Sequence, residues 1–294
     1  MTLDRRALIG GMTGAALFAP FLAIERAMAQ NAARHAGHTP AAGSPSLEEQ
    51  EAMAARHDTA MQELFGENLF KNEQIAMLLY PGFTALDLVG PHYFFACLFG
   101  AKVHLVTTGT DLAPVASDLG LAISPTVTLE DTPADLDVLF VPGGTTGTMK
   151  VMRSERTMAW VKDRAARAKH ITSVCTGSMI LGKAGVLKGK RATSHWAAFP
   201  VLEDFGAIPV NQRVVKDGNI LTGAGVSAGL DFAIALTEQL RGRNYAEALV
   251  LQAEYAPEPP IVAGSMTTAS PPVGNMMGQM FAPLADQFRA LARG

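Results

Sequence analysis

Cysteine is scarce in this sequence, which has only Cys97 and Cys175 among its 294 residues. Neither belongs to a Cys-x-x-Cys pair or to a cysteine and histidine spacing typical of zinc. Two cysteines cannot form a disulfide framework, and we expect no bound metal. Cys97 lies in the run YFFACLF, which is typical of the apolar face of a helix, so we expect it in the core. One disulfide between the two cysteines is the alternative.

The sequence also lacks an excess of basic residues. Its 24 lysines and arginines are outnumbered by 27 aspartates and glutamates, which gives a net charge of -3. Proteins that bind nucleic acid through its phosphates need the opposite balance, so nucleic acid is not an expected partner. No Walker sequence is present. The runs GGTTGT and GAGVSAG lack the full spacing and the acidic residue of a dinucleotide-binding site.

The first 29 residues have the three regions of a bacterial export signal. Arg5 and Arg6 precede an uncharged stretch, residues 7–24, and the segment closes on Ala27-Met28-Ala29. The paired arginines resemble the twin-arginine type of signal, whose route carries folded proteins. We expect cleavage after Ala29, a periplasmic protein, and no stable membrane insertion after cleavage. An uncleaved membrane anchor is the alternative.

Four segments are expected after the signal. Residues 30–45 are rich in alanine, glycine, histidine and proline and predict a linker. Ser46 and Glu49 have the spacing of a capping box, so residues 46–72 are expected to form an N-terminal helical extension. Residues 73–265 are assigned to the main domain, and residues 266–294 to a C-terminal tail with a helix.

The main domain alternates apolar strand patterns with helical ones. Expected strands are IAMLLY, KVHLVTT, DVLFV, HITSV, KRATS and NILTGAGV, and expected helices include residues 154–168 and 227–241. Continuous apolar strands separated by helices predict an α/β domain with a mostly parallel sheet covered on both faces. In such a sheet, ligands bind outside the carboxyl ends of the strands.

The octapeptide ITSVCTGS places Cys175 where an apolar strand meets a helix of small residues. This pattern predicts a nucleophile elbow, with the side chain on a sharp turn beside a helix N-terminus. The N–H groups of that helix favour negative charge, so we expect a pKa for Cys175 below the ordinary value of about 8.5. A buried, unreactive thiol is the alternative.

Four motifs together resemble the DJ-1/PfpI superfamily over about residues 74–240: ALDLVGP, VPGG, SVCTGS and ATSHW. Within it, HITSVCTGSMILGKAGVLKGKRATSHWA and LQAEYAPEPPIVAGS resemble the bacterial isocyanide hydratases. The resemblance implies a single flavodoxin-like, class I glutamine amidotransferase-like domain. It further implies a homodimer that uses no cofactor and converts a small isocyanide to an N-substituted formamide. Hydratases of this kind begin near the first strand, whereas this chain has an export signal and a further segment before it. The resemblance therefore says less about the natural substrate than about the chemistry.

The resemblance also implies roles for particular residues. Cys175 would attack the isocyanide carbon, which gives a thioimidate for water to hydrolyse. The backbone N–H groups of Gly144 and Thr176 would stabilise developing negative charge, and Thr145 would contact the substrate. The Thr176 hydroxyl would either assist the cysteine or cap its helix. His195 would either form a dyad with the cysteine or be held by core hydrogen bonds.

Asp87 in ALDLVGP has two interpretations. It lies where a strand leads into a helix, so it could cap that helix. The resemblance instead puts its carboxyl against the Cys175 sulfur. A carboxylate and a thiolate repel each other, so the two groups would share one proton, which raises the pKa of Asp87 and makes it a general acid and base.

Other functions use the same cysteine. A peptidase or a glyoxalase-like enzyme of this superfamily would act on different substrates. A sensor, reading out either a ligand or oxidation of Cys175, is a different class of protein. The expected pocket walls are Phe83–Ala85, Thr145–Met149 and the surroundings of Val226, which are small or apolar and fit a modest apolar substituent.

Overall fold

The computed structural model describes residues 46–293, and the chain divides into two compact units after Leu69. The predicted export signal and linker therefore lie outside the described residues. The first unit contains helix α2 (Leu47–Phe65) and the 3-10 helix η2 (Gly66–Asn68). The predicted capping box is confirmed: Ser46 N–H donates to Glu49 Oε2 at 2.7 Å, and Glu49 N–H donates to Ser46 Oγ at 3.2 Å.

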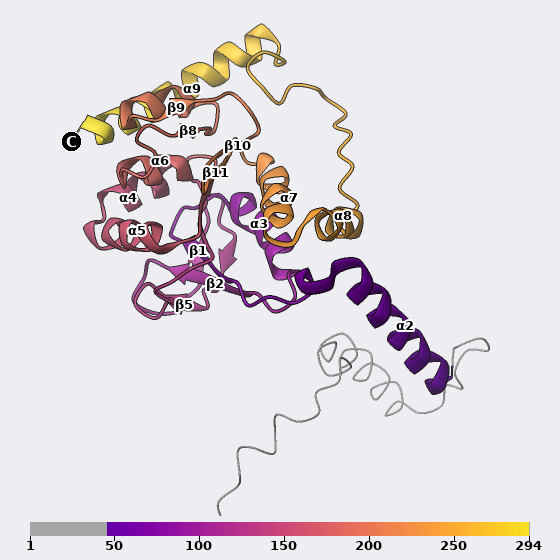
Figure 1. Ribbon diagram of the computed structural model, residues 1–294. Helices are drawn as coiled ribbons and strands as arrows, with labels where there is room; N and C mark the ends of the chain where they lie inside the picture. Colours follow the sequence, from indigo (N-terminus) through magenta and orange to yellow (C-terminus); the bar gives the residue numbers. More distant parts are fainter. Residues whose placement is uncertain (1–45, 294) are drawn as a thin grey trace, which may run out of the picture. The chain divides into compact units, whose positions relative to one another are not determined.

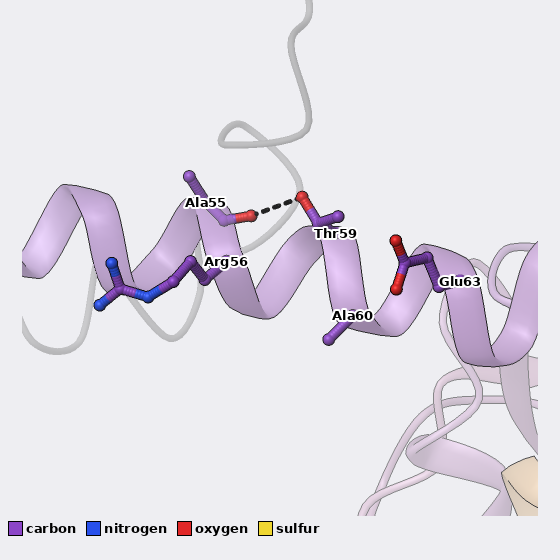
Figure 2. Close-up of a pocket in the computed structure, with 5 residues that line it drawn as sticks. All are labelled: Ala55, Arg56, Thr59, Ala60 and Glu63. Carbon is purple, nitrogen blue, oxygen red and sulfur yellow. Dashed lines mark hydrogen bonds between the residues drawn. The ribbon is translucent and has the colours of Figure 1, made fainter.

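A shallow hollow lies along α2 (Figure 2). The described residues that line it all belong to this one helix: Ala55, Arg56, Thr59, Ala60 and Glu63. The Thr59 hydroxyl is already engaged, because it donates to Ala55 O at 2.9 Å. The hollow is thus the ordinary relief of an exposed helix.

The second unit is built on a seven-stranded sheet in the order β10-β11-β7-β6-β1-β2-β5 (Figure 1). Its strands, in chain order, are β1 (Gln74–Leu79), β2 (Lys102–Thr107), β5 (Val127–Thr128), β6 (Val138–Val141), β7 (His170–Val174), β10 (Val214–Asp217) and β11 (Ile220–Gly223). All neighbouring pairs are parallel except β10 and β11, which form an antiparallel hairpin. Gly218 turns this hairpin with a φ of 61°, as the Asp-Gly pair indicates.

Helices cover both faces of this sheet, which confirms the predicted fold class. Those on one face are α3 (Ala85–Ala96), α7 (Ala228–Arg241) and α8 (Arg243–Gln252); those on the other are α4 (Thr146–Arg153), α5 (Glu155–Arg167) and α6 (Gly177–Lys183) (Figure 1). The long C-terminal helix α9 (Pro271–Arg293) packs on α4, α6 and the 3-10 helix η3 (Phe199–Phe205). Of the described helices, none is both long enough and apolar enough to cross a membrane.

Apolar burial explains why the central strands form. Strands β1 and β6 are buried along almost their whole length, and Phe140 on β6 packs against Phe95 of α3 and Phe232 of α7. Side chains buried on both faces of a parallel sheet give the continuous apolar runs seen in the sequence.

Two expectations need correction. The KRATS segment adds no strand to the main sheet: β8 (Arg191–Ala192) pairs only with β9 (Ile208–Pro209) in a separate small sheet. A second small sheet joins β3 (Val115–Ala116) to β4 (Ala122–Ile123) as an antiparallel pair. Cys97, which was expected in the core, is only half-buried. The helix α3 ends at Ala96, so Cys97 is its C-cap residue and does not extend the apolar face of the helix. Both cysteines are free thiols.

Candidate active site

Cys175 occupies a sharp turn between β7 and α6. Its φ is 58°, in the left-handed region that a residue with a side chain seldom adopts. Its N–H donates to Ala224 O at 2.7 Å and to Gly223 O at 3.2 Å, and only 5% of the residue is exposed. These backbone contacts hold the thiol at the carboxyl end of the sheet.

Asp87 lies in the first turn of α3, whose N-cap residue is Thr84. The carboxyl is fully buried, and its Oδ2 accepts a hydrogen bond from Gly143 N–H at 2.9 Å, from the turn that follows β6. Its Oδ1 has no hydrogen-bond partner among the described residues. The carboxyl therefore points away from its own helix toward the turn, and the capping interpretation does not describe it.

Gly143 lies between the Asp87 carboxyl, the Cys175 side chain and the backbone of Thr176. A Cβ atom on this glycine would lie 2.6 Å from Thr176 N, 2.7 Å from Asp87 Oδ2 and 2.8 Å from Cys175 Cβ. Such approaches leave no room for a side chain. The absence of one allows three segments, from the ends of β1, β6 and β7, to come together.

Burial raises the pKa of Asp87 from its ordinary value of 3.8 to about 7. Hydrogen bonds from Cys175 and from Gly143 N–H lower the pKa in part, whereas the charge of Asp118 raises it. The direction is the one expected from sequence, but the main cause is loss of solvation and not repulsion by a thiolate. Near neutral pH this carboxyl is therefore available both to accept and to donate a proton.

The expected low pKa of Cys175 is wrong. Burial raises the pKa of the thiol well above its ordinary range, and the charge of Asp87 raises it further. The Thr176 N–H and hydroxyl lower it, as expected for groups at a helix start, but only in part. The resting sulfur consequently carries its proton, and a base must remove that proton before the sulfur can act as a nucleophile.

Gly144 does not present a free N–H group as expected, because that group donates to Thr176 Oγ1 at 2.9 Å. The Thr176 hydroxyl in turn donates to Gly144 O and lies 3.1 Å from the hydroxyl of Thr148. Thr176 is thus linked to the glycine turn, while its own N–H lowers the pKa of the Cys175 thiol. The interpretation of Thr176 as a simple cap is not supported, since its side chain caps no helix.

The expected wall at residues 145–149 also differs from the structure. Thr145 is the half-buried N-cap of α4, and its side chain makes no capping hydrogen bond. Thr148 and Met149 belong to the helix itself and are buried. Within residues 145–149, only Thr145 and Thr146 can reach a substrate, because Thr148 and Met149 are buried in α4.

His195 packs between two aromatic rings, 5.3 Å from Trp196 and 5.8 Å from Phe281 between ring centres. Its Nδ1 accepts a hydrogen bond from Ala197 N–H at 3.3 Å. Burial lowers its pKa from 6.5 to about 4, so the ring is neutral at neutral pH. This environment supports the structural interpretation of His195.

Sequence reasoning missed several residues that contact the elbow. Ser194 Oγ donates to Cys175 O at 3.1 Å, and Ser178 Oγ donates to the same carbonyl at 3.0 Å. Ser194 belongs to the ATSHW motif, directly before His195. Gly143 belongs to VPGG, but only the fold reveals its contact with Asp87.

Comparisons with known proteins identify the family of the chain. The sequence model of the DJ-1/PfpI family matches residues 73–239, more than half of the chain. The chain belongs to the DJ-1/PfpI family. It is 50% identical over 196 residues to isonitrile hydratase from Pseudomonas putida, covering 67% of this chain and 84% of that protein. Protein DJ-1alpha from Drosophila melanogaster is 34% identical over 149 residues, covering 50% of this chain and 69% of that protein.

A crystal structure of a THiJ/PfpI family protein from Pseudomonas syringae superposes with a TM-score of 0.74. It is 53% identical and covers 76% of this chain and 92% of that one. The agreement shows that this DJ-1/PfpI chain shares the fold of that relative. Within the described residues, no three histidine, cysteine, aspartate or glutamate side chains gather in a way that could hold a metal ion.

Proposed function

We propose that this protein is a cysteine-dependent hydratase that converts an isocyanide, R–N≡C, to an N-substituted formamide, R–NH–CHO. The observation that carries the proposal is the meeting of the Asp87 carboxyl and the Cys175 thiol at Gly143. The 50% identity to a protein named isonitrile hydratase supports the choice of substrate.

In the first step, the ionised Asp87 removes the thiol proton as the Cys175 sulfur bonds to the terminal carbon of the isocyanide. Asp87 then delivers that proton to the same carbon. The product is a thioimidate, R–N=CH–S, in which one S–H bond has been exchanged for one C–S and one C–H bond. A carboxyl with a pKa of about 7 suits both transfers, because neither of its protonation states is strongly favoured at neutral pH.

In the second step, Asp87 takes a proton from water while the oxygen adds to the thioimidate carbon, and the nitrogen receives that proton. The C–S bond then breaks, and the remaining hydroxyl proton returns to sulfur. The Thr176 N–H, which lowers the pKa of the thiol, stabilises the departing thiolate. The net change is addition of one water, and no oxidant, reductant or cofactor is consumed.

Two surface features support the expected substrate and assembly. The rings of Trp196 and Phe281 are 5.3 Å apart beside His195, the residue after the serine that bonds to the Cys175 carbonyl, and we propose that the apolar substituent of the substrate packs against them. Leu86, Val89 and Tyr93 form an exposed apolar stripe on α3, which suits a homodimer contact. Light scattering on the purified protein measures its mass, and a monomer at micromolar concentration would contradict the dimer.

The function is tested by incubating the purified protein with an alkyl and an aryl isocyanide and measuring formamide by mass spectrometry. Methylglyoxal and a peptide, assayed in parallel, test the glyoxalase-like and peptidase alternatives. We expect turnover of an isocyanide alone, and abolished turnover in Cys175→Ala. Cys97→Ser is the matched control and should keep nearly full activity, because its thiol lies outside the site. Normal turnover in Cys175→Ala would refute the mechanism.

A further inference from the structure

A chain of three buried hydroxyl groups extends behind the nucleophile elbow. The Tyr80 hydroxyl lies 3.0 Å from Thr148 Oγ1, which lies 3.1 Å from Thr176 Oγ1. The three residues are no more than 2% exposed. Tyr80 is the residue after β1, Thr148 is on α4 and Thr176 is at the start of α6, so the chain links three elements.

Two backbone carbonyl groups fix this chain. The Tyr80 hydroxyl is 2.9 Å from Pro142 O, to which it donates. The Gly144 carbonyl is approached by two hydroxyl groups, that of Thr148 at 3.0 Å and that of Thr176. A carbonyl oxygen has two lone pairs, so it can accept from both at once.

The Thr176 hydroxyl has a second place to donate, because Thr176 directly follows Cys175 in the chain and its hydroxyl lowers the pKa of that thiol. When the sulfur becomes a thiolate, a hydroxyl proton turned toward it makes a charge-assisted hydrogen bond. That turn removes one donor from Gly144 O. A buried carbonyl left without a donor is costly, but here the Thr148 hydroxyl remains on it.

We propose that Thr148 is a positioning residue: by keeping a donor on the Gly144 carbonyl, its hydroxyl frees the Thr176 proton to turn toward the Cys175 sulfur. The Tyr80 hydroxyl gives its only proton to Pro142 O, so its oxygen competes with the Gly144 carbonyl for the Thr148 proton. Neither residue touches the sulfur in this arrangement. Their effect is on how readily the thiolate forms, and only the consequence for turnover rests on the proposed hydratase function.

The test measures alkylation of Cys175 by iodoacetamide as a function of pH, in a Cys97→Ser background so that one thiol reacts. Thr148→Val keeps the shape of the side chain and removes the hydroxyl. We expect its alkylation profile to move to higher pH by about one unit, with a rate at pH 7.5 lower by about tenfold. Thr148→Ser restores the hydroxyl and should react within about twofold of the parent. Tyr80→Phe removes the competing acceptor and should give a smaller shift in the opposite direction, to lower pH.

Turnover of an isocyanide provides a second readout. Thr148→Val should lower kcat with little change in KM, because the substrate contacts are intact. If no isocyanide is turned over, the proposed function fails while the alkylation profiles still test Thr148. An unchanged alkylation profile in folded Thr148→Val overturns the proposal. The proposal is also overturned if Thr148→Val loses stability and Thr148→Ser, which keeps the hydroxyl, loses it as well. Should Thr148→Val not fold, the Tyr80→Phe profile decides, and no shift there overturns the proposal.

Discussion

Replacing Asp87 with asparagine should change how the stability of the protein depends on pH. The carboxyl is fully buried, and its pKa in the folded protein is about 7, compared with 3.8 for the ordinary group. The folded state therefore holds this proton more tightly than the unfolded state does. The stabilisation is fully present below about pH 4 and is lost as the pH rises through 7.

The size of the effect follows from the two pKa values. One pKa unit corresponds to about 1.4 kcal/mol, so the shift of Asp87 represents on the order of 4 kcal/mol over the whole range. Between pH 5 and pH 8, the wild-type protein should lose about 3 kcal/mol of this contribution. The side chain introduced in Asp87→Asn has no proton to lose, and its amide oxygen can still accept from Gly143 N–H. The free energy of unfolding of the variant, taken relative to that of the wild type, should therefore rise by about 3 kcal/mol between pH 5 and pH 8.

The assay is urea unfolding of both proteins at pH 5, 6, 7 and 8, with the free energy of unfolding compared at each pH. Asp135→Asn is the matched control, because it removes the same charge from an 89% exposed side chain. Its difference from the wild type should stay constant with pH. A constant difference for Asp87→Asn as well would refute the claim that the buried carboxyl holds a proton. The same variant should lower the hydration rate by at least about a hundredfold, and wild-type kcat/KM should rise with pH up to about 7.

Three further predictions concern the rest of the chain. Gly143→Ala should lower turnover by on the order of a hundredfold, because its methyl group would displace the acid and the thiol; Gly264→Ala, where nothing lies within 4 Å, should be silent in the same assay. His195→Phe should keep turnover within several-fold, and a hundredfold loss would reinstate a Cys-His dyad. Blotting of cell fractions should find the shortened chain in the periplasm, and the Arg5→Lys, Arg6→Lys double variant should lose export; wild-type chain of full length in the cytoplasm would contradict the signal.

The fold could be predicted wherever a strand is buried on both faces. The runs at 74–79, 138–141 and 170–174 are apolar because both sides of these strands are covered by helices, and this pattern is visible locally. KRATS has a similar local pattern but joins only two residues to a small sheet. Its pairing depends on where residues 208–209 lie, which no local pattern contains.

The motifs are enough to propose which residues form the site, whereas several contacts of those residues differ from what the sequence led us to expect. Motif resemblance brought Asp87 and Cys175 together, although the hydrogen bond that orients Asp87 joins residues 56 positions apart. The expected use of the Gly144 N–H failed because the side chain of Thr176 turns back onto it. That orientation depends on neighbours from α4, and sequence spacing carries no information about it.

The pKa of Cys175 shows why local and distant effects must be weighed together. The helix start and the Thr176 N–H are local, and they lower the pKa as the octapeptide predicts. Burial and the charge of Asp87 come from distant segments and raise it by more. The result is a thiol that keeps its proton until a base takes it. A nucleophile of this kind should react slowly with general oxidants, which favour exposed thiolates, and in the proposed mechanism its dependence on Asp87 ties its reactivity to a substrate that can receive the proton.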